Sequence, residues 1–267
     1  MKHNKDEAEN RSTSYAAARQ QEILKLLSQD ASVSVADLAA HFNVSKPSIR
    51  RDLRMLDEMG LLQRTYGGAV RTVSPFSEAT FSERKVSHHD EKIRIGEAAA
   101  QQILPGMVVF IDGGTTTDCI VPFMLDRNVT VVTYALNVMN HLATSEEVTL
   151  IGIGGTIDNR TLTFGGVLAL ASVEAYNMQF DIAFISCAAV SARRGVTNDN
   201  LEVIPIKRIA IESAQRVILL ADSSKVGRGA AGSIAPIDKF GQLITGNGVA
   251  TDEVKQLRAL GIDVELV

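Results

Sequence analysis

The chain has 267 residues, of which 45% are hydrophobic and 22% are charged, and its formal net charge is −4. This length suits a small domain joined to a larger one, and the apolar share excludes a globally disordered chain. Its two cysteines, Cys119 and Cys187, lack metal-binding spacing, which favours a reducing compartment over a disulfide or zinc scaffold. No apolar run reaches the ~18 residues of a membrane span, and the N-terminus lacks the apolar core of a secretion signal. We therefore expect a cytoplasmic protein without a membrane partner, with residues 1–14 as a disordered tail.

The acidic net charge does not exclude nucleic acid, because the charge is unevenly distributed. Residues 1–71 contain 11 Lys and Arg against 9 Asp and Glu, and residues 41–71 contain 6 against 3. The rest of the chain carries 16 basic and 22 acidic residues. A surface that faces DNA phosphates needs only local positive charge. The N-terminal part therefore remains compatible with a DNA partner.

Two helices are predicted before residue 44. Residues 15–30 form the first. Ser34 is placed to cap the second, because apolar residues then follow at i, i+3, i+4 and i+7, namely Val35, Leu38, Ala39 and Phe42. Asp37, three residues after the cap, resembles a capping box. A short link then leads to a third helix.

The segment 44–70, VSKPSIRRDLRMLDEMGLLQRTYGGAV, predicts that third helix and a hairpin. Ser45 suits the helix start, and one apolar stripe recurs at helical spacing, made of Ile49, Leu53 and Leu56. Gly60 suits the helix end, and Gly67-Gly68 supplies the positive φ of a tight hairpin. Helices and a hairpin in this order are typical of a winged helix-turn-helix domain, which binds double-stranded DNA. The alternative is a generic three-helix bundle with a charged surface.

The helix face opposite the stripe carries the predicted DNA contacts. Arg51 is the predicted base-reading residue, because a guanidinium pairs bidentately with guanine in the major groove. Arg50 fits a backbone contact or a local ion pair with Asp52 or Glu58 equally well. Other basic residues of the helix and wing fit phosphate contacts. The predicted DNA-binding set is Ser45, Lys46, Ser48, Arg50, Arg51, Arg54, Arg64, Tyr66, Gly67 and Gly68.

Residues 72–89 are rich in Ser, Pro and charge, which is typical of a linker. His88 and His89 would point ~100° apart on a helix, so a metal site is not expected. The predicted organisation is a winged helix-turn-helix domain at 15–73, a linker at 74–90 and an α/β domain at 91–267.

The C-terminal part alternates short β-branched runs with helical stretches. The runs lie at 107–111, 129–132, 148–153, 181–186, 217–221 and 242–245, and VELV ends the chain. Continuous apolar strands that alternate with helices predict a mainly parallel sheet with helices on both faces. The expected fold class is therefore α/β, preceded by the winged helix-turn-helix.

Ligands bind at the carboxyl ends of the strands in such sheets, so the residues that follow each strand are candidates. The first run is followed by DGGTTT at 112–117, the third by Gly154 and Gly155, and the fifth by DSSK at 222–225. Glycines let backbone N–H groups approach an anion, and threonine hydroxyls add donors. A phosphorylated small molecule fits this set. The alternative is that the glycines only make tight turns and the lysine is solvated.

These motifs resemble those of the DeoR family of bacterial transcriptional regulators. The resemblance rests on SIRRDL (48–53), RTYGGA (64–69), EKIRIGEAA (91–99), FIDGGTTT (110–117), IKRIAI (206–211) and LLADSSKVG (219–227). The sensor domain of that family is similar to ribose-5-phosphate isomerase and related sugar-phosphate enzymes. The resemblance implies a repressor, as a homo-oligomer (dimer or tetramer), that leaves its operator when a phosphorylated sugar or polyol binds. The alternative is a sugar-phosphate isomerase-like enzyme with a DNA-binding module.

The resemblance also assigns individual residues. Gly114 to Thr116 match the phosphate loop of the family. Asp222 and Lys225 match its DxSK element, and Lys207 matches a lysine on the helix before that element. Tyr66 stands where the wing usually has histidine, residues 186–189 lack the usual glycine and aspartate, and Glu202 lies one residue from the family's acidic position. The expected effector-binding set is Asp112, Gly113, Gly114, Thr115, Thr116, Thr117, Gly154, Gly155, Glu202, Lys207, Asp222 and Lys225. No catalytic residue, cofactor or metal is expected.

Overall fold

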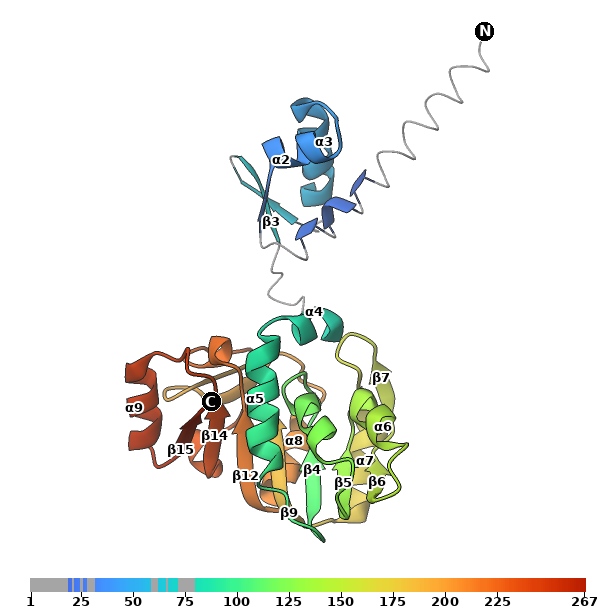
Figure 1. Cartoon of the computed structure of the whole chain (residues 1–267), viewed down its shortest axis with the longest axis vertical. Helices are drawn as coiled ribbons and strands as arrows, with labels where there is room; N and C mark the ends of the chain where they lie inside the picture. The colour runs from blue at the N-terminus through green and yellow to red at the C-terminus, as the bar shows by residue number, and fades with distance from the viewer. Residues whose placement is uncertain are drawn as a thin grey trace. The chain divides into compact units, whose positions relative to one another are not determined.

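The computed structural model describes residues 19–20, 22–24, 26–27, 32–58, 62–65, 67–71 and 80–267. The chain divides into two compact units, residues 1–78 and residues 79–267, and each is described by itself (Figure 1). Among the helices of the described ranges, none is both long and apolar enough to cross a membrane.

The first unit has the winged helix-turn-helix order that the sequence predicts. The described residues between 19 and 27 are helical, and α2 (Val35–His41) and α3 (Lys46–Glu58) follow. The wing consists of β2 (Leu62–Arg64) and β3 (Gly68–Arg71), which pair antiparallel. Apolar side chains from these elements form one core, made of Ile23, Leu27, Val35, Leu38, Ile49, Leu53, Leu56, Leu62 and Ala69. The predicted stripe of the third helix is thereby confirmed.

Both predicted helix caps of this unit are present. The Ser34 hydroxyl accepts a hydrogen bond from the Asp37 backbone N–H at 3.0 Å and donates one to Asp37 Oδ2 at 2.7 Å. The Ser45 hydroxyl accepts from the Ser48 backbone N–H at 3.4 Å. Each cap satisfies a backbone donor that has no partner inside its own helix.

The wing contains a strand that the sequence did not predict. β1 (Ser32–Ser34) pairs antiparallel with β3, so the wing is three-stranded. Gly68 does not have a positive φ; a Cβ there would overlap the backbone carbonyl of Val33. The predicted reason for this glycine is therefore wrong, because the close approach of β1 is what excludes a side chain. Gly60 and Tyr66 lie outside the described residues.

The second unit is built on a seven-stranded parallel sheet with the strand order β15-β14-β12-β9-β4-β5-β6 (Figure 1). Its strands are β4 (Val108–Ile111), β5 (Val129–Thr133), β6 (Val148–Gly152), β9 (Phe180–Ser186), β12 (Ala214–Leu220), β14 (Gln242–Thr245) and β15 (Asp263–Leu266). Every predicted strand run falls in this sheet. The predicted α/β class is confirmed.

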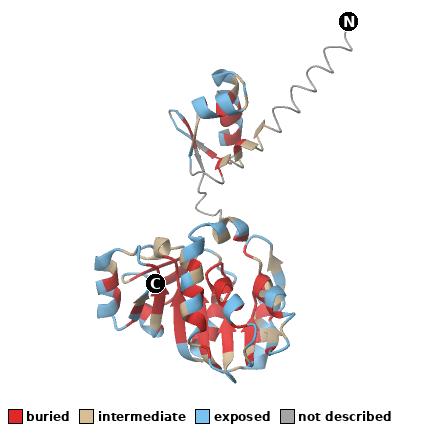
Figure 2. Cartoon of the chain, viewed as in Figure 1, coloured by how far each residue is buried: buried red, intermediate tan, exposed pale blue. Residues whose placement is uncertain are grey.

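Helices cover both faces of the sheet. One layer is α5 (His89–Ala100), η1 (Thr117–Phe123) and α6 (Leu136–Leu142), and the other is α7 (Gly166–Tyr176), α8 (Ile204–Glu212) and α9 (Thr251–Ala259). Within β4, Val109 packs with the first layer and Phe110 with the second. Because strand side chains alternate between faces, two-sided burial requires the continuous apolar runs seen in the sequence. Figure 2 shows the buried residues gathered in these strands.

Smaller antiparallel elements, which the sequence analysis missed, lie beside this sheet. β7 (Thr156–Asp158) pairs with β8 (Thr163–Gly165). A three-stranded sheet contains β10 (Ala189–Ser191), β11 (Gly195–Asn198) and β13 (Gly232–Ala235). Two short 3-10 turns complete the unit, η2 (Ser223–Lys225) and η3 (Ile237–Lys239).

The linker predicted at 74–90 is helical over much of its second half. α4 (Phe81–Val86) begins at a capping box in which the Thr80 hydroxyl accepts from the Glu83 N–H and the Glu83 carboxylate accepts from the Thr80 N–H. Phe81 is buried, and its N–H donates to the Arg160 carbonyl at 2.6 Å. The second unit therefore starts at α4 and not at residue 91. The capping-box spacing of Thr80 and Glu83 is the sequence signal that the linker interpretation overlooked.

Candidate DNA-binding surface and effector site

The predicted base-reading side of α3 is exposed. Lys46, Arg50, Arg51 and Arg54 are all exposed, and Ser48 is half-buried beside Ser45, with the two hydroxyls 3.0 Å apart. Their side chains can enter a groove of DNA, while Ile49, Leu53 and Leu56 on the opposite side of the helix pack in the core. This is the arrangement that a recognition helix requires.

Asp52 has a partner that the sequence did not predict. Its side chain is buried, and Arg19 from the first helical segment contacts it, with Nε 2.6 Å from Oδ2. Gln20 donates to the other carboxylate oxygen at 3.3 Å. Asp52 thus fixes α3 to the first helical segment instead of pairing with Arg50, which leaves the Arg50 guanidinium exposed.

The predicted wing contacts differ in exposure. Arg64 and Gly67 are exposed, and the Arg64 N–H donates to Asp57 Oδ1 at 3.3 Å. Gly68 is buried under β1, and Tyr66 is outside the described residues. In the described part of the wing, exposed Arg64 and Gly67 are the predicted contacts that remain open to DNA.

In the second unit, three neighbouring strands end in polar residues. β9 lies between β4 and β12, and the polar residues at these strand ends are Asp112, Ser186 and Asp222. Because parallel strands share a direction, these residues meet at one edge of the sheet. This edge is the expected ligand end.

Asp112 is the centre of a buried network. Its Oδ2 accepts from the Lys207 ammonium, from the Ser186 N–H at 2.7 Å and from the Ser186 hydroxyl at 2.9 Å. Its Oδ1 accepts from the Tyr134 hydroxyl. Lys207 also donates to the Ser186 carbonyl at 3.1 Å and is 1% exposed. Burial, followed by the negative charge of Asp112, raises the pKa of Tyr134 well above its ordinary value.

This network uses Asp112 and Lys207 to hold the loop that follows β4. The Thr117 hydroxyl donates to the carbonyls of Asp112 at 2.8 Å and Gly114 at 3.0 Å. A Cβ at Gly114 would crowd the Ser186 hydroxyl at 2.7 Å, so this glycine is also needed for packing. Asp112, Lys207 and Thr117 therefore act as scaffold, and their polar atoms already have partners.

Thr116 differs from these residues, because its hydroxyl is buried and has no hydrogen-bond partner among the described residues. The segment after the loop is the 3-10 helix η1, and it contains Pro122, which lacks a backbone N–H. An unpartnered buried hydroxyl is costly unless something binds it, so Thr116 is a candidate donor to a ligand.

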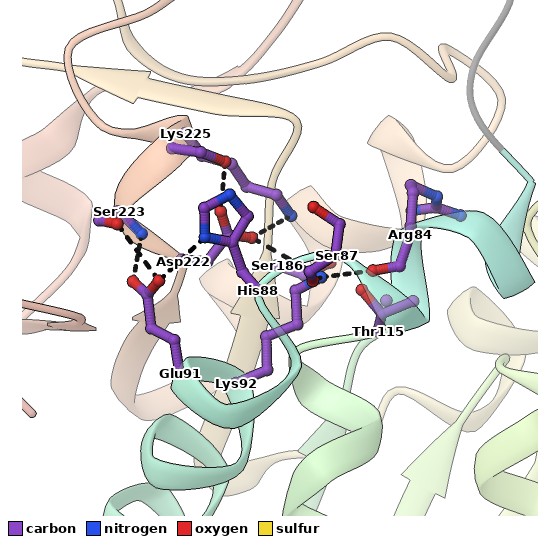
Figure 3. Close-up of polar contacts among 12 residues, drawn as sticks. Arg84, Ser87, His88, Glu91, Lys92, Thr115, Ser186, Asp222, Ser223 and Lys225 are labelled. Carbon is purple, nitrogen blue, oxygen red and sulfur yellow. Dashed lines mark hydrogen bonds and ion pairs between the residues drawn. The ribbon is translucent and has the colours of Figure 1, made fainter. Parts of the chain in front are cut away.

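A second charged cluster forms around Asp222 (Figure 3). Lys225 Nζ lies 3.7 Å and Lys92 Nζ 4.0 Å from Asp222 Oδ2, and the Ser224 hydroxyl donates to Oδ1. Burial alone would raise the pKa of Asp222, but Lys225, the Ser224 hydrogen bond and Lys92 together hold it below its ordinary value. Two lysines thus face one buried carboxylate.

Lys92, which the sequence analysis did not select, is 3% exposed. Its ammonium also donates to the carbonyls of Arg84 and, at 2.6 Å, Ser87, at the end of α4 (Figure 3). Burial, partly opposed by Asp222, lowers the pKa of Lys92 from 10.5 to about 8. Charged neighbours, Asp90, Glu91 and Arg94, made this lysine look like part of a solvated helix side, since charged residues are rarely fully buried unless they are paired.

Cys187, the residue after Ser186, is a buried thiol. Burial raises the pKa of Cys187 to about 11, while the charges of Lys225 and Lys207 act to lower it. Charges from both clusters, around Asp112 and around Asp222, therefore act on this thiol. Among the described residues no group of three or more His, Cys, Asp and Glu is placed to hold a metal ion.

The remaining predicted effector residues are Gly154, Gly155 and Glu202. Gly154 and Gly155 follow β6, the edge strand, and a Cβ at Gly155 would crowd the Gly165 carbonyl at 2.6 Å. Glu202 is exposed, and its side chain lies beside Gly165. The structure gathers these residues near the start of α7, which supports a packing role for Gly155.

Two family models match the chain. The model described as the DeoR-like helix-turn-helix domain matches residues 19–74, and the model described as the DeoR C terminal sensor domain matches residues 87–247. These matches cover both units.

Named relatives match over most of their length. The glycerol-3-phosphate regulon repressor of Escherichia coli (strain K12) is 33% identical over 81% of this chain and 86% of the relative. The HTH-type transcriptional regulator IolR of Bacillus subtilis (strain 168) is 35% identical over 85% of this chain and 90% of the relative. Ribose 5-phosphate isomerase A from Methanocaldococcus jannaschii aligns with a TM-score of 0.38 and 18% identity over 52% of this chain and 55% of the enzyme, too slight a likeness to bear on function.

Proposed function

Because this chain belongs to the DeoR family of DNA-binding transcriptional regulators, we propose that it represses a sugar or polyol catabolic operon and is released by a phosphorylated sugar or polyol. As a family member it is a transcriptional regulator and not an enzyme. The first unit binds double-stranded operator DNA through α3 and the wing. The second unit binds the effector in the cytoplasm and joins the chain into a dimer or tetramer, whose geometry sets the spacing of the operator half-sites.

The observation that carries this proposal is the cationic pair around Asp222. Lys225 and Lys92 converge on one carboxylate at the carboxyl end of the sheet, beside a loop with an unpartnered threonine hydroxyl. Lysine binds phosphate as a point charge, and hydroxyl and backbone donors add direction. Phosphate is therefore the group that fits, and the name of one relative, a glycerol-3-phosphate regulon repressor, supports a small phosphorylated effector.

Release follows from linkage. An effector that binds the DNA-incompetent arrangement more tightly shifts the population away from the operator, and operator DNA weakens effector binding by the same factor. α4 is the first element of the second unit, and Lys92 contacts both its last carbonyls and Asp222. Through Lys92, a change at Asp222 on effector binding would be passed to α4, which follows the DNA-binding unit in the chain.

The test is operator binding with DNA upstream of the chain's own gene, with and without phosphorylated sugars and polyols and their unphosphorylated counterparts. We expect one phosphorylated compound to release the protein and its unphosphorylated counterpart to have no effect. Tight DNA binding that none of these compounds disturbs would overturn the effector part of the proposal.

Lys225→Ala sharpens this test. We expect the variant to bind the operator with unchanged affinity and to resist release, because only the anion site loses a charge. Lys255→Ala is the matched control, since Lys255 is 73% exposed on α9. Release of the Lys225 variant at the wild-type effector concentration would show that the site has been misplaced.

A further inference from the structure

The motif EKIRIGEAA at 91–99 contains a carboxylate whose position only the structure explains. Glu91 lies in the first turn of α5, and its Oε1 accepts from the Ser223 backbone N–H at 2.6 Å. Its Oε2 accepts from the Ser223 hydroxyl at 3.2 Å, and His88 Nδ1 is also 3.2 Å away (Figure 3). The Glu91 side chain of α5 thus accepts two hydrogen bonds from Ser223, the first residue of η2.

The end of β14 leaves space for this carboxylate. A Cβ at Gly246 would overlap Glu91 Oε1, and a Cβ at Gly248 would crowd the Ser223 hydroxyl at 2.9 Å. Gly246 does not have a positive φ, so its backbone does not require glycine. The absence of a side chain at Gly246 instead makes room for Glu91.

Ser223 lies between the two residues that form the charged part of the predicted anion site. The Lys225 N–H donates to the Asp222 carbonyl at 3.0 Å, which closes η2 around Ser223. Within this turn Asp222 is 1% exposed and Lys225 Nζ lies 3.7 Å from its carboxylate. The direction of the Lys225 side chain therefore depends on how the Ser223 peptide is held.

We propose that Glu91 is a positioning residue, seated by Gly246, that holds η2 so that Lys225 faces the phosphate of the effector. This inference rests on the proposed function, because it takes Lys225 as an anion-binding residue. A carboxylate suits this role because hydrogen bonds to an ionised acceptor are stronger and more directional than neutral ones. The side chain is 13% exposed, so water competes little for these hydrogen bonds.

The first experiment uses inorganic phosphate, the group common to all the proposed effectors. The rise in Tm with phosphate, relative to chloride at equal ionic strength, is measured for the full chain and its variants. We expect Glu91→Ala to raise the half-saturating phosphate concentration about tenfold, the lower end of what the loss of an orienting partner costs at bound-ion sites. Glu91→Gln keeps an acceptor for the Ser223 N–H and should lie between Glu91→Ala and the wild type.

Gly246→Ala tests the same role without removing the carboxylate. The added Cβ displaces Glu91 from Ser223, so this variant should reproduce the phosphate dependence of Glu91→Ala. The matched controls are Glu97→Ala, an exposed glutamate of α5, and Gly241→Ala, where a Cβ meets only the Val217 carbonyl at 3.9 Å. A variant that lowers the Tm but leaves the phosphate concentration unchanged would make Glu91 a purely structural cap and overturn the proposal.

A second measurement separates this proposal from the proposed function. The resonance of ¹³C-dimethylated Lys225, assigned by Lys225→Arg, reports the surroundings of its amine without any effector. We expect Glu91→Ala and Gly246→Ala to shift it and the two controls to leave it in place. An unmoved resonance would overturn the positioning role. A wild-type protein that phosphate does not stabilise would instead overturn Lys225 as the anion site.

Discussion

The two candidate sites are built in opposite ways. On α3, the predicted DNA contacts are exposed side chains on a helix whose other side makes the core. At the end of the parallel sheet, Asp112 and Lys207 are buried, and their polar atoms bind one another and the chain. A substitution on α3 therefore separates binding from folding, whereas a substitution in the sheet-edge network changes both.

The two buried aspartates, Asp52 in the first unit and Asp112 in the second, differ in how far their partners are buried. Asp52 pairs with Arg19, a partly exposed partner from a neighbouring helix, while Asp112 pairs with Lys207, which is 1% exposed. Desolvation makes an unpaired charge far more costly in the second setting. We therefore expect the Asp112 network to tolerate substitution less well than the exposed side of α3.

Lys207→Met should have the largest effect of the substitutions that test this contrast. It leaves the Asp112 carboxylate buried without its cation, and we expect the free energy of unfolding to fall by about 3–5 kcal/mol. Urea unfolding of the full chain, followed by circular dichroism, measures it. Lys255→Met, at an exposed position, should change the value by less than about 0.5 kcal/mol. A loss below about 1 kcal/mol for Lys207→Met would mean that Tyr134 and Ser186 satisfy Asp112 alone.

The pH dependence of stability should reveal the burial of Lys92. Its pKa is about 8 in the folded chain against 10.5 ordinarily, so between these values the unfolded chain binds more protons. Stability relative to the Lys92→Met variant should therefore rise with pH across this window, by about 3 kcal/mol. Urea unfolding of both proteins from pH 7 to pH 10.5 measures it. A flat difference would place Lys92 in water, and a falling one would mean that Asp222 stabilises its charge by more than burial opposes it.

Arg51→Ala should alter recognition without altering the fold. Loss of a bidentate contact costs about 1–3 kcal/mol of discrimination between operator and non-specific DNA. Arg54→Ala, as a phosphate contact, should weaken binding to all sequences and reduce the salt slope by about one. Competition binding at several salt concentrations measures both. An unchanged ratio of specific to non-specific binding for Arg51→Ala would remove its base-reading role.

Ser34→Ala should have the smallest effect. It removes the acceptor for the Asp37 N–H at the start of α2 and costs about 1 kcal/mol of local stability. Native-state hydrogen exchange of the α2 amides detects this loss. Asp37→Asn separates the cap from the charge, because it leaves the Ser34 acceptor in place. Unchanged exchange in Ser34→Ala would mean that β1 pairing, and not the cap, holds this helix end.

Sequence reasoning identified the elements whose pattern is local. The stripe of Ile49, Leu53 and Leu56, the cap at Ser34 and each strand of the parallel sheet follow from spacing alone, and all are present. It failed where a local signal was overlooked, as at the capping box of α4. It also failed where a short strand depends on a distant partner, as for β1 against β3.

For the sites, the sequence determined which residues stand on the exposed side of α3 and which follow the strands. Only the tertiary structure decided their partners. Lys207 and Asp112 are 95 residues apart, and Glu91 and Ser223 are 132 apart. Periodicity describes how a segment meets its own neighbours, whereas such pairs depend on the order of strands and on which helix covers their ends. The order β12-β9-β4 therefore made the loop after β4 a scaffold around Asp112 and made Lys92 a partner of Asp222.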